Sequence, residues 1–289
     1  MEVKMQIDII EILKSILFGI VEGITEWLPI SSTGHLIILN EFISLKASEG
    51  FLEMFDVVIQ LGAIVAVIII FFKQIWPFGK SGEEEPLKKT GVLSYVKKDI
   101  FFLWLKILVA CIPAILAMPF DDQFEKWFRN PTCVSIVLIV FGIGFIIIES
   151  MHKGKEAKVN SLLELSFKLA FIIGIFQFIA AVFPGTSRSG ATILGALLLG
   201  VSRKVAAEFT FFLAIPAMIG ASLFKLLKFG FTFTSTEILL LVIAMVTAFL
   251  VSVFVIKFLM SYIKKHDFKV FGWYRIALGI LVLAFMIFR

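Results

Sequence analysis

Long stretches of this sequence contain no charged residue, and these stretches indicate which class of protein it is. The runs 57–72, 130–148, 169–187, 209–224 and 238–256 hold no Asp, Glu, Lys or Arg, and each approaches the ~20 residues that a membrane-spanning helix needs. None alternates in polarity from residue to residue, which argues against a membrane β-barrel. Apolar residues make up 60% of the 289 residues, above the roughly 45–50% of soluble domains. The sequence therefore predicts a helical integral membrane protein.

Cysteine is also scarce, and the basic residues form no nucleic-acid surface. Cys111 and Cys133 both lie in apolar stretches without metal-ligand spacing, so we expect buried thiols rather than a disulfide. The net charge is +5, but the lysines cluster in the loops between apolar stretches, a pattern typical of membrane topology. We therefore expect membrane lipids, and no nucleic acid, as surroundings and partners.

The pattern of apolar runs and breakers predicts an all-α polytopic membrane protein with six transmembrane helices plus two re-entrant broken helix pairs. The broken pairs are expected at 9–44 and 169–201, where polar turns interrupt the apolar pattern. The six full spans are expected at 56–73, 99–119, 131–149, 207–225, 237–257 and 270–288.

The two broken regions resemble each other, which predicts an internal duplication. Gly19, Ile24, Pro29 and Ser32 recur without a gap 155 residues later as Gly174, Ile179, Pro184 and Ser187. We expect a single membrane domain, 1–289, with repeats of about 9–149 and 165–288. Because each repeat holds an odd number of spans, the second repeat is expected to be inverted, as in many transporters.

The distribution of Lys and Arg predicts the orientation. The loops at 73–98, 150–168, 201–206 and 257–269 carry 16 basic residues, whereas the opposite loops carry five. The positive-inside rule places the first set in the cytoplasm. Both termini are then outside, and the segment 74–98 is a solvated cytoplasmic loop.

Two acids in the first broken region are the first candidates for chemistry. Glu22 and Glu26 are four residues apart and so share one face of a helix. Such a pair can bind a divalent cation, Mg²⁺ or Ca²⁺, or one acid can hold the metal while the other acts as a base. The alternative is that they cap a helix or pair with a basic residue at a wet rim.

The polar run that follows Pro29 predicts a phosphate-binding helix start. Ser31, Ser32 and Thr33 offer hydroxyl groups beside the free N–H groups of a helix N-terminus. His35 lies three residues after Ser32, where it can exchange a proton with the serine or with a leaving phosphate. Serine and threonine are also ordinary N-cap residues, and a structural role for the histidine is the alternative.

The second break supplies a cation. Arg188 lies about twenty residues beyond Lys168 and fifteen before Arg203, too deep for a snorkelling arginine, and a guanidinium grips phosphate oxygens through two N–H groups. The residues around it, Gly185, Ser187, Ser189 and Thr192, complete an anion cradle. Folding the repeats together would join the acids and serine of one half to the arginine of the other.

Four further polar residues are weaker candidates. Asp56, Gln60 and Glu208 lie at or inside the starts of spans, and Arg275 lies beside Trp273 and Tyr274. Each is expected to form an interhelical hydrogen bond or an interfacial anchor as readily as a site.

At this point the two motifs are recognisable. The runs EGITEWLPISSTGH (22–35) and PGTSRSGAT (184–192) resemble the signature motifs of bacterial undecaprenyl-diphosphate phosphatases of the bacitracin-resistance type. The resemblance extends over nearly the whole chain, including FDVVIQLGA at 55–63, AAEF at 206–209 and the Tyr274-Arg275 pair.

The resemblance implies an activity, a location and roles for the motif residues. It implies hydrolysis of undecaprenyl diphosphate to the monophosphate in the bacterial cell membrane, which recycles the lipid carrier of peptidoglycan synthesis, and it implies bacitracin resistance and a divalent metal. It places the acidic motif on Glu22 and Glu26, the nucleophile on Ser32, the histidine on His35 and the phosphate-gripping arginine on Arg188.

A different class of function stays open at this stage. Inverted repeats with broken helices are also typical of secondary transporters, so a carrier or flippase for an anionic lipid or solute is the alternative. A serine beside an acid and a histidine favours the hydrolase, since a transporter needs no aligned nucleophile. The sequence leaves the oligomeric state, a homodimer included, undecided.

Overall fold

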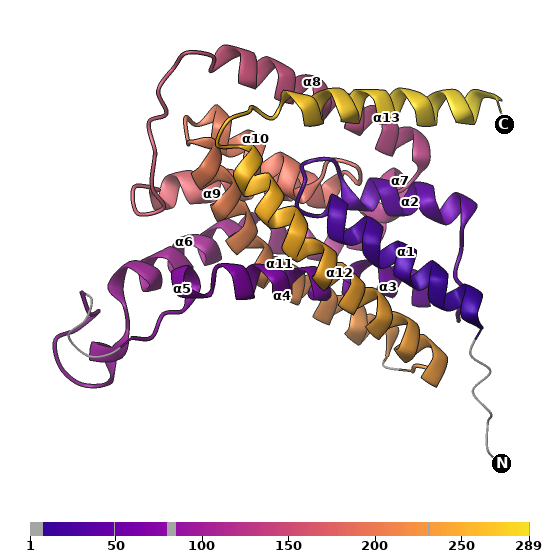
Figure 1. The fold of residues 1–289 in the computed structure, drawn as a ribbon, viewed down its shortest axis with the longest axis horizontal. Coiled ribbons are helices and arrows are strands. Elements are labelled where there is room, and N and C mark those ends of the chain that lie inside the picture. The colour runs from indigo at the N-terminus through magenta and orange to yellow at the C-terminus, as the bar shows by residue number, and fades with distance from the viewer. Residues whose placement is uncertain (1–7, 49, 80–84, 231, 289) are drawn as a thin grey trace.

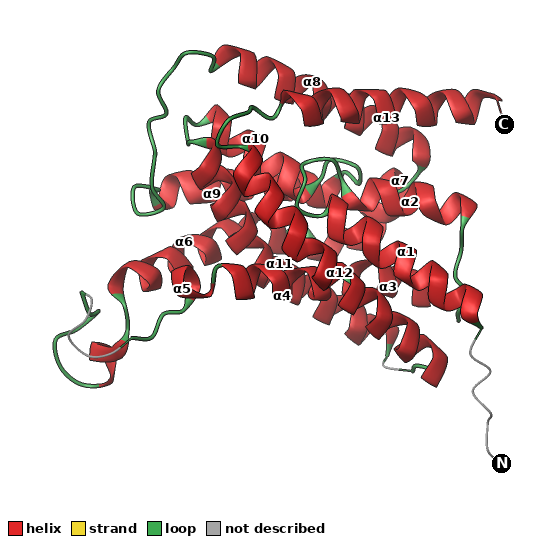
Figure 2. Cartoon of the chain, viewed as in Figure 1, coloured by secondary structure: helices red, strands yellow, loops and turns green. Residues whose placement is uncertain are grey.

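The computed structural model describes residues 8–48, 50–79, 85–230 and 232–288. Within these ranges the chain is helical, and no strand is formed beyond isolated bridges (Figure 2). The helices are α1 (Ile9–Thr25), α2 (Ser32–Phe42), α3 (Phe51–Val58), α4 (Gln60–Ile70), α5 (Phe72–Ile75), α6 (Lys98–Ile115), α7 (Asp121–Phe128), α8 (Pro131–Met151), α9 (Phe167–Val182), α10 (Arg188–Leu198), α11 (Arg203–Phe229), α12 (Ser235–Tyr262) and α13 (Lys269–Phe288), with short 3-10 turns at Val92–Tyr95 and Met118–Phe120.

Six helical segments of the described chain are long and apolar enough to cross a membrane. They are Phe51–Ile70, Lys98–Phe128, Pro131–Met151, Arg203–Phe229, Ser235–Tyr262 and Lys269–Phe288. Each overlaps one predicted span, so the six-span, all-helical prediction is confirmed. The second segment runs beyond its predicted end at 119 because only the short stretch 116–120, with its 3-10 turn, separates α6 from the short helix α7.

The two interrupted regions each form a helix, a turn and a second helix. In the first, α1 is followed by the turn 26–31 and α2, and in the second, α9 is followed by the turn 183–187 and α10. Both second helices begin on a serine N-cap, Ser31 or Ser187, whose side chain accepts from the amide of a glycine three residues on. That these pairs re-enter one membrane face stays a prediction.

The packing of α1 and α9 is matched between the two halves. Helix α1 lies along α12, and α9 lies along α6 (Figure 1). A Cβ at Gly19 would lie 2.5 Å from the carbonyl oxygen of Ala244, and one at Gly174 would lie 2.3 Å from that of Ala110. Only glycine allows so close an approach of helix backbones. These contacts accord with a duplication, while the inversion and the repeat boundaries stay predictions.

Helices α8 and α13 pack against each other and lie side by side in Figure 1. A Cβ on Gly142 or on Gly272 would lie 2.7 Å from the carbonyl oxygen of the other glycine. This contact brings α13 close against α8, a type of small-residue interface common in membrane proteins. It also carries Arg275, three residues after Gly272, into the interior, where its exposed fraction is 0%.

Candidate active site

The first turn presents an acid and a serine to each other. Glu26 is the C-cap of α1 and Ser32 is the first residue of α2. The Ser32 hydroxyl donates to Glu26 Oε2 at 2.6 Å, and both side chains are buried. Ser31, between them, has a φ of 76°, which a non-glycine residue adopts at a cost of about 1–3 kcal/mol. The turn therefore adopts a strained backbone conformation in which the Ser32 hydroxyl points toward Glu26.

The second turn repeats this form but carries a cation. Ser187 has a φ of 70° and caps α10, whose first residue is Arg188. The preceding Gly185 has a φ of 94°, a conformation that favours glycine. Ser31 and Ser187 are thus structurally equivalent, although the gap-free sequence comparison pairs Ser187 with Ser32. The second turn has one more residue between its proline and its N-cap serine than the first, so Arg188 takes the position that Ser32 has in the first turn.

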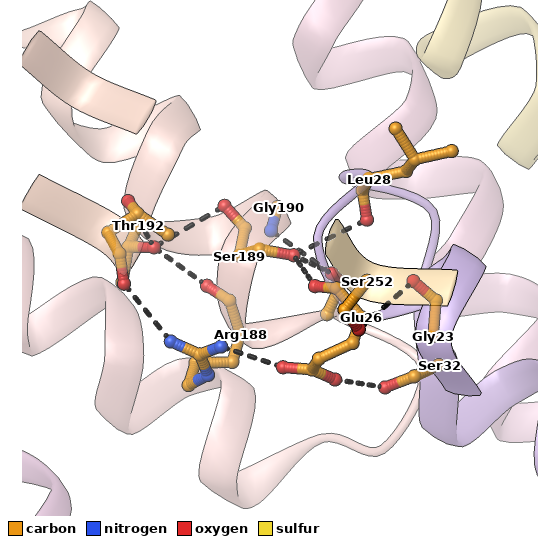
Figure 3. Close-up of polar contacts among 11 residues, drawn as sticks. Gly23, Glu26, Leu28, Ser32, Arg188, Ser189, Gly190, Thr192 and Ser252 are labelled. Atoms are coloured by element: carbon orange, nitrogen blue, oxygen red, sulfur yellow. Dashed lines mark hydrogen bonds and ion pairs between the residues drawn. The ribbon is translucent and has the colours of Figure 1, made fainter. Parts of the chain in front are cut away.

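The two turns meet in one hydrogen-bonded line, shown in Figure 3. Glu26 Oε1 accepts from Arg188 Nη2 at 2.7 Å while Oε2 accepts from Ser32, so the carboxylate joins the two helix starts. Ser189 strengthens the junction by donating to the backbone carbonyl of Glu26 at 3.0 Å. The structure thus brings the acid and serine of the first motif to the arginine of the second, as the sequence predicted.

Arg188 has donors left for a ligand. Its Nη1 donates to the carbonyl oxygen of Thr210 at 3.2 Å, and its Nη2 is taken by Glu26. Its Nε is buried and has no hydrogen-bond partner. An unpaired buried donor costs about 1–3 kcal/mol, and a phosphate oxygen would satisfy it.

Glu22 lies one turn before Glu26 on α1 and is fully buried. No donor group hydrogen-bonds either of its carboxylate oxygens, but the carboxyl group of Glu26 lies close enough for a carboxyl–carboxyl hydrogen bond, and Asp56 and Arg188 also interact with it electrostatically. No group of three or more His, Cys, Asp and Glu side chains within the described ranges is arranged to hold a metal. Mg²⁺, however, is commonly held by one or two carboxylates together with water and substrate phosphates. Glu22 and Glu26 fit that kind of site.

The ring nitrogens of His35 hydrogen-bond groups other than the Ser32 hydroxyl. Its Nδ1 donates to the Ser31 carbonyl oxygen, and its Nε2 hydrogen-bonds the Tyr274 hydroxyl, both at 2.7 Å. The two rings stack with an interplanar angle of 7°. In this arrangement the partner of the Ser32 hydroxyl is Glu26 and not His35.

The remaining predicted binding residues surround the junction. Thr33 follows Ser32 in the first turn of α2, where backbone amides have no intrahelical acceptor. Thr192 is buried, donates to the carbonyl oxygen of Arg188 at 2.9 Å and accepts from the Thr210 hydroxyl at 2.9 Å. Thr192 therefore supports the arginine rather than facing the serine.

Three contacts around the site were not predicted. Thr210 holds Arg188 and Thr192, and Tyr274 holds His35. Arg275 is fully buried and forms an interhelical hydrogen bond to Leu138, one of its two expectations, but its bonds to both turns were not expected. The only sequence signal for it was a cation within a predicted span.

Asp56, one of the weaker candidates, forms interhelical contacts. Its Oδ2 accepts from Arg129 at 3.1 Å and from Asn40 at 3.3 Å. Arg129 also pairs with Glu125 of α7. Asp56 therefore joins α3 to α2 and to the end of α7, the interhelical role that was one of its two expectations.

The fold and the site together define a class: a polytopic membrane protein whose two helix breaks enclose a buried polar centre suited to phosphate chemistry. Comparison with known families agrees with this class. The chain belongs to the family described as "Bacitracin resistance protein BacA", whose model matches residues 15–281.

Relatives of similar length cover almost the whole chain. The chain is 59% identical over 280 residues to a protein of Lachnoclostridium phytofermentans, a match covering 97% of this chain and 98% of the relative. It is 60% identical over 280 residues to one of Enterococcus faecalis, covering 96% and 98%. A protein of Acetivibrio thermocellus is 51% identical over 279 residues, covering 96% and 98%. All three relatives carry the name undecaprenyl-diphosphatase.

Proposed function

We propose that this protein is a membrane phosphatase that hydrolyses undecaprenyl diphosphate to undecaprenyl phosphate and inorganic phosphate in the bacterial cell membrane. Its product is the lipid carrier of peptidoglycan synthesis, and the same activity accounts for bacitracin resistance. The observation that carries the proposal is the line from Ser32 through Glu26 to Arg188, which joins a nucleophile, a base and a phosphate-binding cation. The names of the relatives support the same substrate.

Glu26 is the base in this proposal. The Ser32 hydroxyl already donates a hydrogen bond of 2.6 Å to Glu26 Oε2. As the proton moves to the carboxylate, the oxygen of Ser32, or of a water in its place, becomes more nucleophilic. The oxygen attacks the terminal phosphorus, and the bond from that phosphorus to the bridging oxygen breaks. The polyprenyl monophosphate leaves. If Ser32 is the nucleophile, water then hydrolyses the phosphoserine.

Positive charge around the phosphates lowers the barrier. Arg188 contributes its unpartnered Nε, and α2 and α10 both begin at the junction, so the positive ends of two helix dipoles point at it. Phosphoryl transfer depends mainly on positioning and charge stabilisation. A small polar chamber of this kind is sufficient for the reaction.

A divalent cation, Mg²⁺ or Ca²⁺, would be held by Glu22 and Glu26, and when bound it would neutralise charge on the diphosphate. The paired carboxylates and the partnerless oxygens of Glu22 support this assignment. His35 is assigned to proton exchange through Nε2, the ring nitrogen that faces Tyr274. Ser31, Ser187 and Ser189 shape the turns around the phosphates.

One assay tests the proposal. The protein, purified in detergent, is incubated with undecaprenyl diphosphate with and without EDTA, and released phosphate is measured. We expect release that is lost with EDTA and restored by Mg²⁺ or Ca²⁺. Absence of release, together with saturable uptake of the lipid or of an anionic solute into liposomes, would instead support a transporter.

A further inference from the structure

We infer that Arg275 is a positioning residue that clasps the two turns and so sets the distance between Glu26 and Arg188. This inference rests on the proposed phosphatase function for its kinetic consequence. The clasp itself depends only on contacts within the chain, so it is testable without turnover.

The guanidinium group of Arg275 reaches both turns at once. Its Nη1 donates to the carbonyl oxygen of Pro29 at 3.2 Å, and its Nη2 donates to those of Gly185 and Thr186 at 2.9 and 2.8 Å. Pro29 lies in the first turn, and the other two lie in the second. One side chain of α13 thus connects two loops that are 155 residues apart in the sequence.

The positively charged guanidinium group of Arg275 binds backbone carbonyl oxygens of the turns, and within the described residues it forms no ion pair. Its exposed fraction is 0%, and its fourth hydrogen bond, from Nε, also goes to a backbone carbonyl, that of Leu138. The turns follow the C-terminal ends of α1 and α9, where helix dipoles place partial negative charge. The ring of Phe141, 5.7 Å from Cζ, adds a cation–π contact. Three of the four carbonyl contacts of this buried cation therefore depend on both turns staying in place.

The glycine at position 190 leaves room for the clasp. A Cβ at Gly190, in the first turn of α10, would lie 2.8 Å from Arg275 Nη1. The guanidinium therefore lies directly against the backbone that follows Arg188 and Ser189. Alanine at 190 would push the guanidinium away without altering any charge.

Lysine cannot replace the arginine in this geometry. Two turns are held by separate nitrogen atoms of a rigid, planar fork, whereas an ammonium group offers its donors from one point. Lysine would keep the charge and most of the stem yet hold one turn at a time. Displacement of catalytic groups by about 1 Å can lower the rate roughly 10²-fold. We therefore expect Arg275→Lys to lower kcat more than it weakens substrate binding.

The experiment compares Arg275→Lys and Gly190→Ala with two matched controls. Lys106→Met removes another buried cation that donates to two carbonyls, those of Leu162 and Leu163, but contacts neither turn. Gly220→Ala adds a Cβ where no atom lies within 4 Å. Each variant is measured for kcat and KM, for thermal unfolding, and for hydrogen–deuterium exchange of the amides in 26–31 and 183–187.

We expect Arg275→Lys and Gly190→Ala each to lower kcat by about 30–100-fold, with KM changed less than about three-fold, and to be non-additive in the double variant. Exchange should rise in both turns, at amides such as Ile30 and Thr186, which are hydrogen-bonded within them. Lys106→Met should change exchange near 160–165 and leave both turns protected.

Two results would overturn the clasp. One is unchanged exchange in both turns of Arg275→Lys, and the other is a kcat of Arg275→Lys equal to that of Lys106→Met at the same loss of thermal stability. If the wild-type chain releases no phosphate, the proposed function fails, while the exchange data still decide whether Arg275 holds the turns.

Discussion

Glu26 and Arg188 form an ion pair of 2.7 Å although 162 positions separate them in the sequence. Each lies beside a helix break, and neither break could bury its charged residue alone without leaving it unpaired. The pair therefore makes the two halves of the chain interdependent. In the proposed mechanism it also places the base in direct contact with the phosphate-binding cation.

Arg188→Lys tests whether the arginine acts through its shape. The guanidinium uses separate nitrogens for Glu26 and Thr210 and keeps Nε for a ligand. Lysine retains the charge but cannot make these contacts together, so we expect kcat/KM to fall by about 10²-fold or more, corresponding to the loss of two charge-assisted hydrogen bonds at about 1.5–3 kcal/mol each.

Arg203→Lys is the matched control. Arg203 also donates several hydrogen bonds to a buried acid, Glu149, but both residues lie outside the two turns. It should cost stability without a comparable loss of turnover. Equal kinetic losses in the two variants would indicate that Arg188 has only a structural role.

Glu22→Gln tests the proposed metal site. Both Glu22 oxygens are buried and accept no hydrogen bond from a donor group, so replacing the carboxylate by an amide should weaken cation binding without breaking such a bond. We expect the metal concentration for half-maximal phosphate release to rise about ten-fold or more, since Mg²⁺ sites rely on one or two carboxylates.

Glu237→Gln serves as the control for that measurement. Glu237 is also buried, but it caps α12 and bonds Ser48, so its loss should leave the metal dependence unchanged. A metal dependence of Glu22→Gln identical to that of the wild type would remove Glu22 from the metal site.

His35→Asn separates the two nitrogens of the imidazole. An asparagine amide can still donate to the Ser31 carbonyl oxygen in place of Nδ1, but nothing replaces Nε2. If Nε2 exchanges protons during the reaction, kcat should fall by about 10²-fold, the usual scale of general acid–base catalysis. Near-normal turnover would instead show that His35 only stabilises the turn 26–31. Tyr274→Phe would then leave kcat unchanged as well.

Gly62→Ala tests the packing that supports the site. A Cβ at this position would lie 2.0 Å from the carbonyl oxygen of Met245, so α4 and α12 would have to separate. We expect the free energy of unfolding to fall by about 1–3 kcal/mol or more, measured by thermal unfolding in detergent. Gly220→Ala has open space around it and should be neutral; equal effects would contradict the close approach.

Much of the fold and part of the site could be predicted from local patterns. The six spans follow from apolar runs, and the breaks follow from Pro29, Pro184 and the hydroxyl residues after them. The meeting of Glu26 with Arg188 followed from folding the two matched breaks together. These signals are carried by composition and spacing along the chain.

The contacts made by α13 could not be predicted in the same way. Arg275 and Tyr274 lie in an apolar stretch that resembles a membrane end, and their position depends on how closely Gly272 lets α13 approach α8. The offset of one residue between Ser31 and Ser187 likewise depends on the backbone form of each turn. Such features arise from tertiary packing, which spacing along the sequence does not encode.

The most direct measurement is phosphate release from undecaprenyl diphosphate by the wild-type protein and by Glu26→Gln, with Glu237→Gln as a buried-carboxylate control, at saturating Mg²⁺ or Ca²⁺. The account predicts metal-dependent release by the wild type and by the control. It predicts a loss of about 10²–10⁴-fold in Glu26→Gln, the scale of a removed general base, in protein that stays folded at the assay temperature although its ion pair with Arg188 is lost. Release by Glu26→Gln within a few-fold of the wild type would contradict it.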